Sequence, residues 1–168
     1  MSPSALPGRP HVFSARSTWG GPGARTTTEV RRFSRRSELT SGVGVPPVSA
    51  SAARAFFGDA DAWNPETLLL SALAQCHLLA FLRQAGLAGW EVAEAVVDAN
   101  GELTLNADGA GGFVAASLAP RTLFSDWEPS ADELLGLHAE AHRQCFIANS
   151  LSFPVSLLPD AGWAPSGA

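Results

Sequence analysis

Residues 64–82 read NPETLLLSALAQCHLLAFL, and this stretch decides how the rest of the chain must fold. Asn64 is of the type that caps helices, Pro65 suits the first helical position, and Glu66 complements the positive end of the helix dipole. Because the following residues are apolar on nearly all sides, we predict a long central helix that ends near Gly86 and is buried on most sides. A small domain rarely covers such a helix alone, so we expect a partner subunit.

A second helix is predicted near the C-terminal end, and it carries the other cysteine. Residues 130–133 read SADE, the pattern of a capping box that opens a helix. Leu134, His138, Ala141 and Cys145 then recur at the spacing of one helix face. We therefore expect Cys145 to face inward from this helix.

The segments around the two helices alternate between apolar and polar residues, as strands do. Before the long helix, a turn signal at residues 20–23 separates two such segments. Tight turns are also predicted at Asn100-Gly101 and Asp108-Gly109. The predicted strands are residues 11–19, 26–33, 38–41 and 43–51, then 90–99, 102–107 and 112–118, and finally 152–158.

This order of elements predicts an α+β fold. It consists of an N-terminal β-hairpin and sheet, a long buried central helix, a β-meander, a second cysteine-bearing helix and a C-terminal strand. We expect a single domain over residues 11–159. Residues 1–10 and 160–168 are expected to be tails, the first of them flexible.

Composition excludes several classes of protein. Hydrophobic residues make up 46% and charged residues 16%, which is typical of a globular chain. The longest apolar run, residues 68–82, contains Ser71, Gln75 and His77 and is too short to span a membrane. Two distant cysteines without an export signal do not make a disulfide framework, so we expect a cytoplasmic protein with reduced thiols.

Basic residues are concentrated in the N-terminal third of the chain. Eight of the eleven arginines precede residue 55, against only Glu29 and Glu38. No aromatic interleaving or nucleic-acid module accompanies them, so we expect no nucleic-acid partner. The basic sheet is instead expected to pack near the acidic remainder of the same chain or of a second copy.

Each cysteine has polar neighbours in an otherwise apolar run, which favours thiol chemistry in an apolar pocket. Two other interpretations remain open. His138, His142 and Cys145 share a helix face, and Cys76 and His77 could complete a Cys/His metal site suited to zinc. A non-catalytic dimer with a pocket for a lipid or another small molecule is the second.

The two cysteine motifs together resemble the OsmC/Ohr family, the osmotically inducible protein C and organic hydroperoxide resistance proteins. The resemblance rests on Asn64-Pro65-Glu66 followed by Cys76, and on Ala141-His142-x-x-Cys145 before a closing strand. The strings that follow each cysteine are more similar to the OsmC-like branch. The resemblance implies an intertwined homodimer, without a cofactor or a metal, that reduces organic hydroperoxides and is regenerated by an external dithiol.

The resemblance also implies roles for individual residues. Cys76 would attack the peroxide, and Cys145 would resolve the sulfenic acid into a disulfide. An arginine of the N-terminal sheet and Glu66 would assist, and we expect Arg35, or its neighbour Arg36, to be that arginine. Adjacent residues on a strand point to opposite faces, so only one of the two can reach the pocket.

Physical chemistry supports a need for the arginine. Only the thiolate attacks a peroxide, and burial in apolar surroundings disfavours ionisation of a thiol. Cys76 lies too deep in its helix for the helix dipole to help. Glu66 lies ten residues earlier, ~15 Å along the axis, so its expected role is to orient the arginine. His77, His138 and His142 are possible pocket residues without an assigned role.

Overall fold

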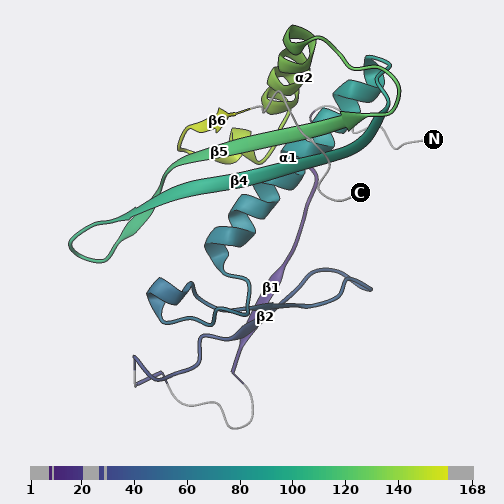
Figure 1. Ribbon diagram of the computed structural model, residues 1–168. Helices are drawn as coiled ribbons and strands as arrows, with labels where there is room; N and C mark the ends of the chain where they lie inside the picture. Colours follow the sequence, from purple (N-terminus) through teal and green to yellow (C-terminus); the bar gives the residue numbers. More distant parts are fainter. Residues whose placement is uncertain (1–7, 9, 21–26, 29, 159–168) are drawn as a thin grey trace. The chain divides into compact units, whose positions relative to one another are not determined.

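The computed structural model describes residue 8 and residues 10–20, 27–28 and 30–158 (Figure 1). The chain divides into two compact units, Met1–Thr67 and Leu68–Ala168. The predicted C-terminal tail lies outside the described residues, as does the predicted N-terminal tail except for Gly8 and Pro10.

The first unit contains a three-stranded antiparallel sheet in the order β1-β2-β3. It is followed by a short 3-10 helix, η1. The bounds are β1 Arg16–Trp19, β2 Ser37–Thr40, β3 Val48–Ala50 and η1 Arg54–Phe56. β1 therefore pairs with β2, where the sequence predicted a pairing with residues 26–33.

The prediction of a strand over residues 26–33 is wrong for its described residues, which form turns and a bend. Side chains form hydrogen bonds with backbone carbonyls that a strand would use for pairing. Arg35 donates to the carbonyls of Val30 and Phe33, and the indole nitrogen of Trp19 donates to the carbonyl of Ser34. These bonds stabilise a turn in place of a second hairpin strand.

Helix α1 spans Pro65–Leu87, one residue beyond its predicted end. The Asn64 side chain accepts a hydrogen bond from the Thr67 amide at 2.8 Å, which confirms the predicted cap. The prediction of burial on most sides is wrong within this chain. Its buried residues form one stripe at a spacing of four, Leu73, His77, Phe81 and Ala85. By length and composition alone the helix could cross a membrane, and its buried stripe packs in two apolar clusters of the second unit.

The sheet of the second unit is built on one long hairpin. β4 (Val92–Leu105) and β5 (Gly111–Phe124) are antiparallel, and β6 (Val155–Leu157) pairs with β5 in parallel. The predicted meander is wrong, because β4 runs through Asn100-Gly101 and the chain turns at residues 106–110. A Cβ on Gly101 would lie 2.5 Å from the Phe113 ring, so this glycine permits close packing and does not form a turn.

Helix α2 spans Ala131–Arg143, and both hydrogen bonds of the predicted capping box at Ser130 and Glu133 are present. The helix ends before Cys145, contrary to the prediction. Gln144 caps it, and Cys145 lies in the turn that leads to a 3-10 helix, η2 (Ala148–Ser150). Cys145 is nevertheless fully buried, as its position on the inward face predicted.

Two apolar clusters join the helices to the sheet of the second unit. One is centred on Leu73, Leu118 and Cys145, and the other contains Phe81 and Phe124. Both clusters combine residues of α1 with residues of β5, and each includes a residue on or directly after α2. The region of Cys145 is therefore held by contacts with both α1 and the sheet.

Candidate functional site

The two cysteines, far apart in sequence, come together in the second unit. Cys76 on α1 is half-buried and packs against the apolar cluster that contains Cys145. Both are free thiols. Apolar side chains surround the pair and come from α1, the sheet and the segment after α2; they include Leu70, Leu73, Ile147 and Phe153.

The surroundings of the Cys145 thiol disfavour its ionisation. Burial raises the pKa of the Cys145 thiol to about 11, and the neighbouring Cys76 thiol adds to this shift. The backbone amide of Ala148 donates to the Cys145 sulfur at 3.4 Å and opposes the shift only in part. Cys145 is therefore a protonated thiol at neutral pH, which makes it a poor first nucleophile.

Three histidines gather between α1 and α2, close in sequence to the cysteines. His77 Nε2 and His138 Nδ1 lie 3.3 Å apart, and their rings stack with centroids 5.5 Å apart. The Phe81 ring stacks on the His138 ring, with centroids 4.2 Å apart. The His142 ring lies 6.3 Å from that of His77. The structure therefore brings together all three histidines that the sequence singled out.

The surroundings of His77 and His138 favour uncharged imidazole. Burial lowers the pKa of His77 to about 4, with a smaller contribution from His142. Burial likewise lowers the pKa of His138 to about 4, with a contribution from His77. Among the described residues, no carboxylate hydrogen-bonds to any of the three rings, so nothing offsets the loss of water.

A polar contact that the sequence analysis missed joins the end of α2 to α1. The Gln144 side-chain oxygen accepts hydrogen bonds from Gln84 at 2.9 Å and from Arg83 at 3.3 Å. Its amide nitrogen donates to Glu140, which also pairs with Arg143. Gln144 directly precedes Cys145, so this contact anchors the segment that carries the thiol. The Glu140–Gln144 spacing of four was the only local signal for it.

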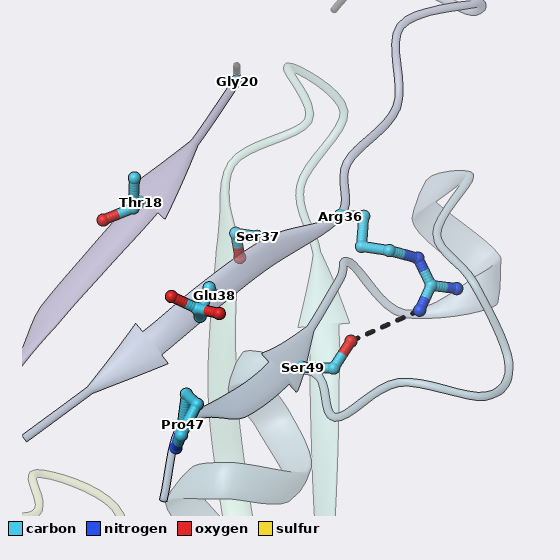
Figure 2. Close-up of a pocket in the computed structure, with 7 residues that line it drawn as sticks. All are labelled: Thr18, Gly20, Arg36, Ser37, Glu38, Pro47 and Ser49. Atoms are coloured by element: carbon cyan, nitrogen blue, oxygen red, sulfur yellow. Dashed lines mark hydrogen bonds between the residues drawn. The ribbon is translucent and has the colours of Figure 1, made fainter. Parts of the chain in front are cut away.

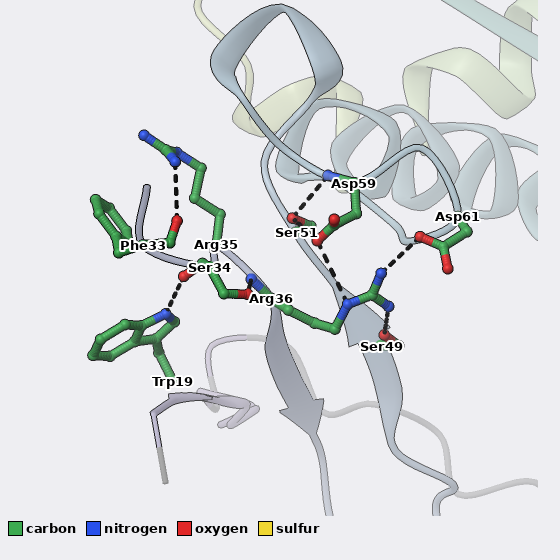
Figure 3. Close-up of polar contacts among 9 residues, drawn as sticks. All are labelled: Trp19, Phe33, Ser34, Arg35, Arg36, Ser49, Ser51, Asp59 and Asp61. Atoms are coloured by element: carbon green, nitrogen blue, oxygen red, sulfur yellow. Dashed lines mark hydrogen bonds and ion pairs between the residues drawn. The ribbon is translucent and has the colours of Figure 1, made fainter. Parts of the chain in front are cut away.

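Arg35 belongs to the first unit and lies close to the rings of Phe33 and Phe57, of which Figure 3 draws that of Phe33. Its guanidinium carbon is 4.4 Å from the centroid of Phe33 and 5.3 Å from that of Phe57. Its hydrogen bonds go to backbone carbonyls, and it makes no ion pair with a described carboxylate. The charge of Arg35 is therefore not neutralised within the described part of the chain.

Arg36 points into a different environment (Figure 3). It contacts Asp61 at 2.7 Å and Asp59 at 3.5 Å, and it donates to the Ser49 hydroxyl. The hydrogen bond to Asp61 raises the pKa of Arg36 and lowers that of Asp61. The Arg36 guanidinium is therefore already paired with two carboxylates.

Glu66 lies in the first turn of α1 and is half-buried. Its Oε2 atom is buried and has no hydrogen-bond partner among the described residues. A buried carboxylate oxygen without a partner is energetically costly. Its chemistry suits an arginine or another hydrogen-bond donor.

A cavity of about 500 Å³ lies on the N-terminal sheet (Figure 2). Thr18, Arg36, Ser37, Glu38 and Ser49 contribute polar groups to its lining. No cysteine or histidine lines it, so this cavity offers no thiol chemistry. Among the described residues, no group of three or more His, Cys, Asp or Glu side chains is arranged to hold a metal ion.

Comparison with known proteins gives a consistent family assignment. The sequence profile of the family described as OsmC-like protein matches residues 58–157. An OsmC-like protein of unknown function from Vibrio cholerae has a similar structure, with a TM-score of 0.81 and 28% identity over 89% of this chain and 99% of that one. No curated protein matches the chain significantly.

More distant structures share the fold. An organic hydroperoxide resistance protein OsmC from Legionella pneumophila has a TM-score of 0.66 and 17% identity, over 89% of this chain and 95% of that one. The organic hydroperoxide resistance protein OhrB of Bacillus subtilis has a TM-score of 0.61 and 21% identity, over 88% of this chain and 98% of that one.

Proposed function

Because the chain belongs to the OsmC-like protein family, we propose that it is a thiol peroxidase that reduces organic hydroperoxides to alcohols in defence against oxidative stress. The distant structural neighbours named organic hydroperoxide resistance proteins support this proposal at the level of the fold. The observation that carries it is the juxtaposition of Cys76 and Cys145 in an apolar cluster of the second unit.

The different environments of the two thiols support the order of attack. Cys145 is fully buried and its raised pKa keeps it protonated, whereas Cys76 is partly accessible. Cys76 is therefore the nucleophile and Cys145 the resolving thiol. The apolar side chains around the pair suit an alkyl or lipid hydroperoxide better than hydrogen peroxide.

The reaction balances in three steps. The Cys76 thiolate attacks the distal oxygen of ROOH, the O–O bond breaks, and a proton converts the departing alkoxide into ROH, leaving a sulfenic acid. The Cys145 thiol then attacks the Cys76 sulfur, and the hydroxyl group leaves as water with the thiol proton. An external dithiol reduces the resulting Cys76–Cys145 disulfide and is itself oxidised.

Arg35 and Glu66 complete the proposed site. The Arg35 guanidinium favours the Cys76 thiolate, and Glu66 orients it through a charge-assisted pair. Within the described residues, Arg35 forms no ion pair and Glu66 Oε2 has no hydrogen-bond partner, and both observations support these roles. Arg36 is the weaker candidate because Asp59 and Asp61 occupy it.

The remaining parts of the proposal concern the assembly. We expect a homodimer in the cytoplasm that acts on an organic hydroperoxide and is regenerated by a dithiol reductant, without a cofactor or metal. Neither nucleic acid nor a membrane is an expected partner.

The test is a count of free thiols per chain, with intact mass, before and after one equivalent of cumene hydroperoxide. Wild-type protein is expected to lose both thiols and about 2 Da, the mass of the two hydrogens lost on disulfide formation. Cys145→Ser is expected to retain a sulfenic or over-oxidised Cys76, and Cys76→Ser is expected not to react. Survival of both wild-type thiols in excess peroxide would refute the peroxidase and favour a non-catalytic small-molecule-binding dimer.

A further inference from the structure

The histidine cluster has no role in the reaction proposed above, yet it lies between the two helices that bring the thiols together. His77 follows Cys76 directly on α1, and it lies on the buried stripe between Leu73 and Phe81. His138 is one of the two buried residues of α2, and Cys145 follows two residues after that helix ends. The contact between His77 and His138 is therefore a principal buried contact between the two thiol-bearing segments.

This contact depends on the rings being uncharged. In neutral form one ring donates and the other accepts across the 3.3 Å between His77 Nε2 and His138 Nδ1. If both rings were in the cationic form, two N–H groups and two positive charges would face each other at this distance. His77 is completely buried and His138 is 2% exposed, so water cannot screen them.

Among the described residues, the surroundings of the pair provide no counter-charge. Besides His138, α2 places His142 near His77, and the charged form of His142 would add repulsion. From α1, Arg83 is directed to Gln144, and Glu140 on α2 is engaged by Arg143 and Gln144.

The sheet offers none either. By the alternation of β5, Thr122 lies on the face that packs against the helices, and its hydroxyl is buried without a partner. Arg121 lies on the opposite face and pairs with Asp98. The two thiols also lie nearby, and the raised pKa of Cys145 keeps that thiol uncharged in acid.

We propose that His77 and His138 are a positioning pair that holds Cys145 against Cys76 while both rings are uncharged, and that their protonation in acid releases α2. The importance of this release for catalysis rests on the proposed function, whereas the release itself does not. The thiol pair would thus be assembled at neutral pH and separated in acid.

The direction of the pH dependence follows from proton linkage. A free histidine has a pKa near 6.5, and these two have values lowered to about 4, so the released state binds more protons between these limits. The contact is therefore fully stabilising above pH about 6.5 and weakens as the pH falls towards 4. Between pH 7 and pH 5, one such histidine shifts the opening equilibrium about 20-fold.

Hydrogen exchange of the α2 amides tests this without any peroxide. Reduced protein is exchanged at pH 7 and pH 5, and rates are corrected for the intrinsic pH dependence of exchange. Wild-type protection over residues 131–143 is expected to fall about 20-fold or more at pH 5. The double variant His77→Leu/His138→Phe, which keeps a ring against Phe81, is expected to change less than about threefold.

The exposed His11 provides the matched control, and His11→Gln is expected to behave as wild type. Equal protection at both pH values in wild type, or an equal fall in the double variant, would overturn the proposal. Should the double variant not fold, ring-proton NMR titration of wild type replaces it. Midpoints of His77 and His138 below pH 5 are then expected, and midpoints near 6.5 would contradict the pair's role. If the proposed peroxidase function proved wrong, the hydrogen-exchange result would still stand, because it is measured without peroxide.

Discussion

At the scale of single residues, the two thiols acquire different properties from the same folded surroundings. Cys145 is enclosed by Leu73, Leu118 and the sheet, and its charged form is disfavoured by the lack of water. Cys76 reaches the edge of the same cluster. The sequence predicted both as redox residues, but the difference in exposure that supports their separate roles arises only when the chain is folded.

The neighbouring arginines differ in a comparable way, and this leads to a prediction. Arg35→Gln is expected to slow the reaction of Cys76 with cumene hydroperoxide about 10- to 100-fold at pH 7, because the proposed role of this cation is to favour the reactive thiolate. Arg36→Gln is expected to change the rate less than about threefold, because two aspartates already neutralise Arg36. Single-turnover peroxide consumption measures both rates.

These two variants control for each other, since both remove one charge from the same strand region. A larger loss in Arg36→Gln than in Arg35→Gln would contradict the assignment of Arg35 as the activating cation. Circular dichroism of both variants separates a loss of rate from a loss of structure, because the aspartate contacts of Arg36 also hold the loop after η1.

At the scale of secondary-structure elements, helix starts were predictable and strand pairings were not. The cap at Asn64 and the capping box at Ser130 are formed by residues within three positions of each other. Local sequence is sufficient for such signals. The Asn100-Gly101 pair has the same residues as a tight turn, but its glycine is needed for packing against Phe113 and Leu70. That distant contact outweighs the local preference.

The close packing at Gly101 makes a prediction about stability. Gly101→Ala is expected to lower the free energy of unfolding by about 1–3 kcal/mol, because its Cβ would lie 2.5 Å from Phe113 and 3.0 Å from Leu70. Gly136→Ala in the middle of α2 is the matched control. Its Cβ would meet nothing within 4 Å, so it is expected to raise stability by about 0.5–1 kcal/mol. Urea denaturation measures both, and equal effects would contradict this interpretation of β4.

At the scale of the whole molecule, α1 is the element that a single chain leaves incompletely covered. Leu79 is 58% exposed and Leu87 is 70% exposed, although the helix is apolar on nearly all sides. Such exposure along a 23-residue apolar helix is unfavourable in water and suits a second copy of the chain. This is the physical basis of the homodimer that we propose.

The dimer can be tested directly. Sedimentation of wild type is expected to give twice the chain mass of 17.5 kDa, and Leu79→Glu is expected to weaken association at least about 10-fold, because it places a charge in an apolar interface. Leu135→Glu provides the matched control, since Leu135 is 50% exposed on α2 and has no role in the proposed interface. A monomeric wild type at micromolar concentration would refute the proposed assembly.

The sequence by itself determined the α+β order of elements, the starts of both helices, the two thiols and the likeness to the OsmC/Ohr family. Each of these depends on residues close together in the chain or on motifs of fixed spacing. Only the tertiary structure decided the long β4–β5 hairpin, the single buried stripe of α1, the contact of Cys76 with Cys145 and the stacking of His77 on His138. These features join residues distant in sequence, and their energies arise from packing and exclusion of water, which no local pattern encodes.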